Sequence, residues 1–161
     1  MNERIEVMVK RKTPVVMKVT QYALIIVAVF LVYMFGIFAI LFSVIAGVLA
    51  WFVGTRSNIE YEYTYFDKEL DVDVIYSMQK RKHIKTYDLA QLEVLAPMGS
   101  YHLDAFKNRD IKARDFSTQF PENEKNVYVM YLAGSEKVIF EPTPELVKTI
   151  ANIAPRKVFT E

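Results

Sequence analysis

The chain has 161 residues, of which 20 are Lys or Arg and 19 are Asp or Glu, so its formal net charge is only +1. This balance does not provide the strongly basic face of a nucleic-acid-binding protein, and no nucleic-acid partner is expected. The absence of cysteine excludes a disulfide framework, a thiolate metal site and a cysteine nucleophile.

Residues 1–13 are basic overall and alternate in hydrophobicity. The alternation is consistent with a short strand added to an open sheet edge or with a tail lying at a membrane face, and we favour the tail slightly. The alternating aliphatic residues are Ile5, Val7 and Val9.

A block without Asp, Glu, Lys or Arg follows, from Val19 to Thr55. As one helix, at about 1.5 Å per residue, it would be about 55 Å long, against a bilayer core of about 30 Å. The tilt needed to fit it exceeds the roughly 40° seen in membrane helices. A break at Gly36 instead predicts two transmembrane helices, about 14–34 and 37–55, within a membrane region 14–56.

The residues on either side of this block indicate how it crosses the membrane. Thr13 is expected to cap the first helix, with Pro14 at the first helical position. A re-entrant hairpin remains an alternative. A cleaved signal peptide is disfavoured, because its apolar region normally spans only about 7 to 15 residues. The positive-inside rule places residues 1–13 in the cytoplasm, and two spans return residues 57–161 to the same side. The expected location is therefore the cell membrane, multi-pass, with both termini cytoplasmic.

The second predicted helix carries a stripe of small residues at spacings of three and four. Small faces let membrane helices approach closely, so the stripe is expected to pack against the first helix. A sharper hypothesis is that it also mediates a homodimer or contact with another membrane protein. No charged residue lies at membrane depth, which disfavours a channel or transporter. The stripe consists of Gly36, Ala39, Ser43, Gly47, Ala50 and Gly54.

After the membrane block the hydrophobic period changes to two, which is typical of strands with one buried face. Runs 58–65 and 69–76 alternate in this way around a turn at Asp67 and Lys68, which predicts a hairpin. Irregular segments are expected at 97–110 and 121–126. Further strands are predicted over 82–88, 91–96, 111–116, 127–132 and 137–141.

Thr143-Pro144-Glu145 opens a last predicted helix, 143–154, which ends at Pro155. No linker or repeat divides residues 57–161. The predicted fold is therefore a membrane α-hairpin plus a β-rich domain, with seven antiparallel strands in a barrel or bent sheet capped by one C-terminal helix.

Several runs along the chain carry a resemblance: Tyr61-Glu62-Tyr63, Glu69-Leu70-Asp71-Val72-Asp73, Lys80-Arg81-Lys82, Val94-Leu95-Ala96-Pro97, Val138-Ile139-Phe140-Glu141-Pro142 and Ala154-Pro155-Arg156-Lys157-Val158-Phe159. With these runs, the chain resembles an uncharacterised family of small membrane proteins of Gram-positive bacteria, known only as a domain of unknown function. The predicted domain is similar to bacterial pleckstrin-homology-like (PH-like) domains. The resemblance covers nearly the whole chain and implies an architecture without a known activity.

In phosphoinositide-binding members of the PH superfold, the first hairpin loop supplies basic residues to the headgroup. We place that loop at Asp67-Lys68, whose neighbours are acidic, so specific inositide recognition is not expected. A second basic cluster lies at the turn between the second and third predicted strands. It is either a set of solvated edge residues or a contact with anionic lipid near the membrane block. The cluster consists of Lys80, Arg81, Lys82 and Lys85.

No catalytic or metal-binding spacing appears in the sequence. Asp71 and Asp73 share one strand face, as expected on any solvated sheet. His83 and His102 lack the i, i+4 spacing of a helical zinc site, and Ser100 lacks a nucleophile elbow. We therefore predict no catalytic residue, no metal and no cofactor.

The leading functional prediction is a membrane-tethered, non-enzymatic binding or scaffolding module at the cytoplasmic membrane face, which engages a protein partner or anionic lipid. The alternative is an accessory subunit of a larger membrane complex, assembled through the small-residue stripe. A hydrolytic enzyme with a site hidden in residues 97–110 is a remote third possibility.

Overall fold

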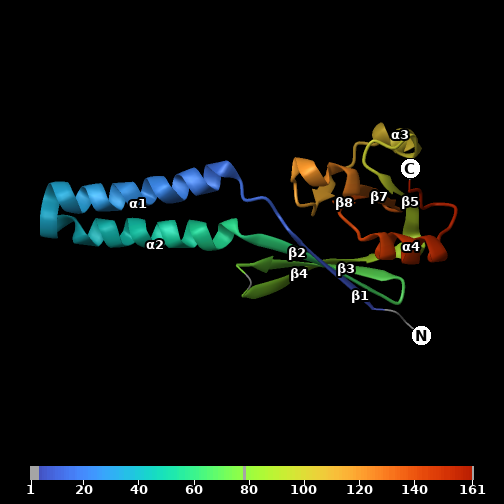
Figure 1. Cartoon of the computed structure of the whole chain (residues 1–161), viewed down its shortest axis with the longest axis horizontal. Coiled ribbons are helices and arrows are strands. Elements are labelled where there is room, and N and C mark those ends of the chain that lie inside the picture. The colour runs from blue at the N-terminus through green and yellow to red at the C-terminus, as the bar shows by residue number, and fades with distance from the viewer. Residues whose placement is uncertain (1–3, 78, 161) are drawn as a thin grey trace.

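The structure is a computed structural model that describes residues 4–77 and 79–160. It consists of a long helical hairpin joined at one end to a β domain with two four-stranded sheets (Figure 1). Along the chain, the hairpin is inserted between two strands that pair with each other, β1 (Ile5–Lys10) and β2 (Ile59–Phe66). Two separate chain connections therefore attach the hairpin to one sheet.

The hairpin contains α1 (Val15–Phe35) and α2 (Ile40–Ser57), joined by the 3-10 turn η1 (Gly36–Ala39). Gly36 has a φ of 55°, a left-handed conformation that glycine adopts without strain, and it ends α1. The stretch Val15–Ser57 is the one helical stretch of the described residues that is long and apolar enough to cross a membrane. Because the chain reverses at Gly36, α1 and α2 lie side by side (Figure 1).

The start of α1 differs from the prediction. No side chain caps this helix, and the Thr13 hydroxyl instead donates to the carbonyl of Ser57 at 3.2 Å. The last carbonyls of a helix lack hydrogen-bond partners within it, so Thr13 supplies a donor to the end of α2 and does not cap α1. The Ser77 hydroxyl donates to the carbonyl of Thr55 at 2.6 Å, which also ties the end of α2 to the sheet.

The first sheet has the order β1-β2-β3-β4 and is antiparallel throughout, with β3 (Glu69–Tyr76) and β4 (Lys80–Asp88). Asp67 and Lys68 both have positive φ, at 48° and 68°, which is the conformation of a two-residue type I′ hairpin turn. The favoured prediction, an N-terminal tail lying at a membrane face, is wrong. Residues 5–10 pair with β2, and Ile5 and Val7 are buried in the core.

The second sheet has the order β5-β7-β8-β6. The predicted seven-stranded antiparallel barrel is wrong in two respects: eight strands divide into two sheets, and β6 runs parallel to β8. The sheets are formed by different parts of the chain, and the edges at β4 and β6 do not pair, so no barrel closes. The strands are β5 (Leu92–Pro97), β6 (Ala113–Asp115), β7 (Tyr128–Leu132) and β8 (Glu136–Phe140).

Short helices connect and cover the strands. They are η2 (Leu89–Gln91), η3 (Tyr101–Leu103), α3 (Asp104–Lys107), η4 (Pro121–Asn126) and α4 (Pro144–Ile153). The Thr143 hydroxyl accepts a hydrogen bond from the Leu146 amide and caps α4, as its sequence predicts. The predicted irregular segment around α3 packs on the outer face of the second sheet, where Leu103 joins Val94 and Val129.

Aromatic side chains join the two sheets in the main core. Tyr63 is fully buried, its hydroxyl donates to the carbonyl of Phe116 at 2.7 Å, and its ring meets Phe140 edge to face. Burial raises the pKa of the Tyr63 hydroxyl well above its usual value. Leu146 and Ile150 of α4 complete this core.

The outer edge of β5 is covered by another segment of the chain, whereas no strand covers the outer edge of β1 among the described residues. The outer edge of β5 is covered by the C-terminal segment: the Leu95 amide donates to the carbonyl of Lys157 at 2.8 Å, and the Phe159 amide donates back to Leu95 at 2.8 Å. No described strand covers β1, the outer strand of the first sheet. An uncovered strand edge is a template for pairing with another chain.

Candidate functional site

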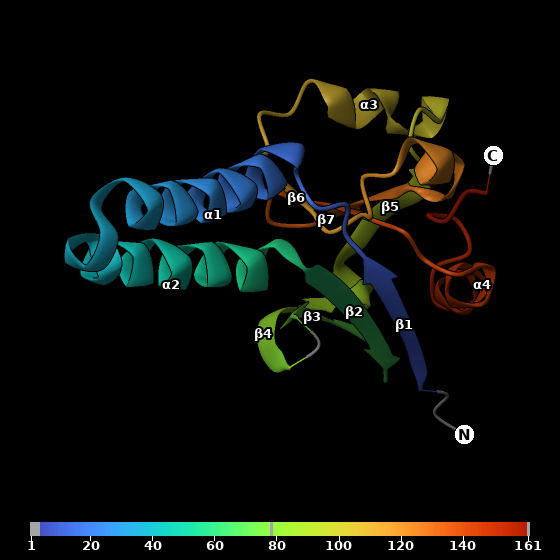
Figure 2. The same ribbon diagram turned by 60° about the vertical axis from the view of Figure 1, so that its left-hand side comes forward.

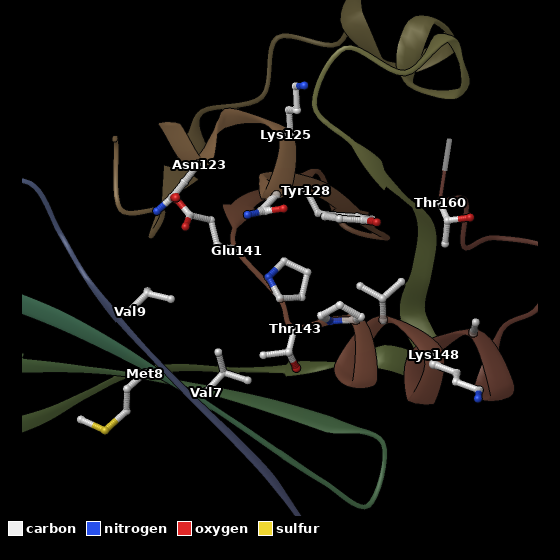
Figure 3. A pocket seen from close by; sticks show the side chains of 15 residues that line it. Val7, Met8, Val9, Asn123, Lys125, Tyr128, Glu141, Thr143, Lys148 and Thr160 are labelled. Atoms are coloured by element: carbon white, nitrogen blue, oxygen red, sulfur yellow. The ribbon is translucent and has the colours of Figure 1, made fainter. Parts of the chain in front are cut away.

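A groove of about 770 Å³ lies beside the uncovered edge of β1. Figure 3 shows its walls: β1 on one side, α4 on another, and the η4–β7 segment with Glu141 between them. Apolar side chains such as Val7, Val9 and Val147 line it, together with the rings of Pro142 and Tyr128. The groove therefore combines a strand edge with an apolar helix face.

The hydrogen bonds at the end of β1 show which backbone groups face this groove. The Arg11 amide donates to the carbonyl of Ile59 on β2 at 2.9 Å, whereas the next amide, of Lys12, donates away from β2 to Thr118 at 2.7 Å. Backbone groups alternate in direction along an antiparallel strand. The backbone groups that point to the free edge of β1 are therefore those of Glu6, Met8 and Lys10.

The groove has an excess of positive charge. Its carboxylate, Glu141, is 7% exposed, and one of its oxygens accepts hydrogen bonds from the amide and the hydroxyl of Thr118, at 2.8 and 2.6 Å. Lys125 of η4 and Lys148 of α4 form no ion pair with any described residue. These two ammonium groups favour an acidic ligand.

The four residues of the predicted basic cluster divide between the two faces of β4. A bulge after His83 changes the alternation, and the pairing with β3 places Lys80, Lys82 and Lys85 opposite inward-facing residues such as Val72 and Val74. Arg81 lies on the outer face, where its guanidinium pairs with Glu62 and lies 3.9 Å from Asp73. Lys85 pairs with Glu136 of the second sheet.

The small-residue stripe is also divided. Ala39, Ala46 and Ala50 are buried between the helices, and the Ser43 hydroxyl donates to the carbonyl of Ala28 at 3.0 Å. A Cβ on Gly54 would lie 2.6 Å from the Gln21 amide nitrogen, whereas one on Gly36 or Gly47 would meet no atom within 4 Å. Ala46, which is not part of the predicted stripe, takes the place expected for Gly47 in the contact with α1.

The remaining polar candidates make structural contacts. Asp73 pairs with His83 at 2.8 Å, and the Asp71 carboxylate accepts a hydrogen bond from Thr86, both across β3 and β4. His102 stacks on Phe159 with ring centroids 3.5 Å apart. The Ser100 hydroxyl accepts a hydrogen bond from the His102 amide, at 3.4 Å. No group of three His, Cys, Asp or Glu residues suited to a metal ion occurs within residues 4–77 and 79–160.

The chain matches, over residues 1–160, a family model described as "Bacterial PH-like domain (DUF6106)". The chain belongs to this family. The match confirms the predicted resemblance to an uncharacterised family with a PH-like domain, a type of domain that typically binds a partner and catalyses no reaction. No curated protein and no solved structure matches the chain.

The order of the strands decides which segment is the first connection of the PH-like domain. Because β1 belongs to the sheet, the connection between the first two strands is the α1–α2 hairpin, and Asp67-Lys68 forms the second connection. The first-loop assignment made from the sequence is therefore wrong. The family match extends through β1, the hairpin and β2, so the hairpin is part of the family's pattern.

Proposed function

We propose that this chain is a membrane-tethered, non-enzymatic binding module whose PH-like domain captures an extended segment of a protein partner along β1. The groove beside β1 carries the proposal, because it joins unpaired backbone groups to an apolar helix face. Extended peptides bind such edges by adding a strand, and side-chain pockets beside the edge then select the sequence.

The hairpin is the proposed tether. Its outward side chains are large and apolar; for example, Phe30, Phe38 and Trp51 are 57%, 88% and 68% exposed. Soluble monomers rarely expose a continuous apolar surface of this extent, and a bilayer would cover it. With two spans and a basic N-terminal flank, the β domain lies at the cytoplasmic face.

The proposed partner segment alternates apolar and acidic residues. Apolar side chains would enter the groove, and carboxylates would reach Lys125 and Lys148. A second copy of this chain, with its β1 paired antiparallel to the first β1, is a poor occupant of the groove. Each β1 leads directly into its own hairpin, so the two hairpins would point to opposite sides and could not share one bilayer.

The accessory-subunit alternative has less support. Most of the small-residue stripe already contacts α1, which leaves Gly36 and Gly47 to meet a further membrane protein.

Peptide selection on the full chain in lipid nanodiscs tests the proposal. Two matched pools of short peptides alternate apolar residues with either acidic or basic ones. The acidic pool should be selected, and a selected peptide should slow hydrogen exchange at the amides of Met8 and Lys10. The amides of β4, the other outer strand of the sheet, serve as the internal control. Equal selection of both pools, or unprotected β1 amides, would refute the proposal.

Two variants sharpen the test. Met8→Pro removes an amide that faces the groove, in an edge position where proline is tolerated, and should weaken binding of the selected peptide about tenfold. Lys148→Glu should weaken it several-fold. Lys68→Glu, an equal charge change in the β2–β3 turn, should leave binding unchanged.

A further inference from the structure

A second cavity, of about 370 Å³, lies where the two sheets fail to close. It is lined by Tyr87 of the edge strand β4, by the edge strand β6 with the residue before it, and by the β7–β8 turn with the start of β8. None of its lining residues belongs to the groove beside β1. Strand addition at β1 therefore leaves this cavity without a role.

The cavity has unneutralised positive charge. Lys112 and Arg114 are exposed and form no ion pair with any residue that the structure describes. Glu136 is the one carboxylate among the lining residues, and it is paired with Lys85 of β4. Lys112 and Arg114 are thus two cations without a counter-charge at the cavity. A third lining residue without an ion pair among the described residues, Lys137, has its ammonium against the Tyr131 ring.

A buried hydroxyl without a good partner adds an independent observation. Tyr87 is 2% exposed, and its hydroxyl forms no well-formed hydrogen bond with any described residue. Burial raises the pKa of Tyr87, and the nearby Arg114 guanidinium opposes the shift through its charge and a weak polar contact. A buried polar group without a partner is costly, so this donor favours an acceptor beside Arg114.

Lysines extend from the cavity toward the hairpin. Lys85, Lys82 and Lys80 follow one another on the inward face of β4. Lys80 lies opposite Tyr76 of β3, and Tyr76 lies opposite Ile59, the first residue of β2, only two positions after the end of α2. On the other side, the guanidinium of Arg11, a few residues before α1, donates to the carbonyl of Asp115 at the end of β6, at 3.3 Å (Figure 2 shows both segments). The cavity therefore lies on the hairpin side of the β domain.

We propose that this cavity binds a phosphate ester, held by the Arg114 guanidinium and the Lys112 ammonium with the Tyr87 hydroxyl as a neutral donor. Arginine and lysine form short charge-assisted hydrogen bonds with phosphate oxygens, and a hydroxyl adds a donor without further charge. The phosphate belongs either to an anionic lipid headgroup or to a soluble ester. The lysines leading to the hairpin favour the lipid.

Lys137 of β8 also belongs to the lining of the cavity, but its side chain supplies a matched control because it is directed to the other face of the sheet. Its ammonium lies 5.4 Å from the centre of the Tyr131 ring, and Tyr131 belongs to the outer face of the second sheet. Neutralising Lys137 changes the net charge as much as neutralising Arg114 does, but it removes none of the three side chains proposed to hold the phosphate.

The experiment uses the full chain in two arms. Native mass spectrometry from detergent micelles compares retention of phosphatidylglycerol with that of phosphatidylcholine, and a titration measures binding of glycerol 3-phosphate. We expect Arg114→Gln and Lys112→Gln each to weaken binding by about tenfold, Tyr87→Phe by about fivefold, and Lys137→Gln by less than about twofold. Selective retention of phosphatidylglycerol identifies a lipid headgroup, and binding of glycerol 3-phosphate alone identifies a soluble ester.

Other outcomes overturn the proposal. It fails if neither probe binds, if Arg114→Gln binds as the wild type does, or if Lys137→Gln loses as much as Arg114→Gln. Arg114 and Lys112 are exposed, so their variants should fold. Tyr87→Phe should leave the melting temperature of the unliganded chain unchanged or raised, because the hydroxyl it removes lacks a good partner. A clear loss of stability in that variant would show that the hydroxyl is already satisfied within the fold.

Discussion

The contact between α1 and α2 predicts opposite responses at two neighbouring small residues. Leucine adds three carbon atoms to Ala50, which is 3% exposed between the helices, and the excess volume has to be accommodated by moving them apart. Such overpacking costs about 1–3 kcal/mol, which lowers the equilibrium constant for the closely packed hairpin about fivefold or more. Gly47→Leu should have no such effect, because no atom lies within 4 Å of a Cβ at that position.

The chain lends itself to a disulfide assay of this contact because it has no native cysteine. The Ser43 hydroxyl lies 3.0 Å from the carbonyl of Ala28, so an Ala28→Cys/Ser43→Cys background should form a disulfide readily in membranes. Ala50→Leu should slow disulfide formation, and Gly47→Leu should leave it unchanged. Equal slowing by both variants, or by neither, would refute the assignment of the helix faces.

Three further predictions concern the β domain. Tyr63→Phe leaves the buried carbonyl of Phe116 without its hydrogen bond and should cost about 1–3 kcal/mol in urea unfolding, whereas Tyr61→Phe, whose hydroxyl bonds a partly exposed guanidinium, should cost less. Burial opposes ionisation of Asp115, but hydrogen bonds from Gln119 and Ser117 lower its pKa overall. Its contribution to stability should therefore be present above about pH 4 and lost as the pH falls further. In the Asp115→Asn variant, the free energy of unfolding should lack this dependence on pH. Thr143→Ala removes the cap of α4 and should cost about 1 kcal/mol by thermal unfolding.

Much of the fold follows from local patterns. Period two marks the β2–β3 hairpin and its two-residue turn, and Thr143 with Pro144 marks the start of α4. Thr13-Pro14 has the same local pattern but a different outcome, because the end of α2 offers Thr13 a carbonyl acceptor. A dipeptide pattern cannot show which distant helix end will lie beside it.

The errors arise from contacts between distant residues. β1 pairs with a strand that follows the whole hairpin, and β6 has only three residues, so neither partner is evident from sequence. The candidate sites depend on the same contacts: the groove needs β1 in the sheet, and the phosphate cavity needs β4 to lie beside β6. The sequence did show Lys85 as part of a basic cluster, but it gave no sign that Arg114 and Tyr87 lie nearby.

Single-cysteine labelling tests the central claim, a hairpin that spans the membrane twice and holds the β domain at the cytoplasmic face. Phe38→Cys lies in the η1 turn at the tip of the hairpin, and Asp67→Cys lies in the β2–β3 turn of the domain. A membrane-impermeant maleimide should label Phe38→Cys in intact cells and Asp67→Cys only after the membrane is permeabilised. Labelling of both positions in intact cells, or protection of Phe38→Cys with labelling of Asp67→Cys, would contradict the account.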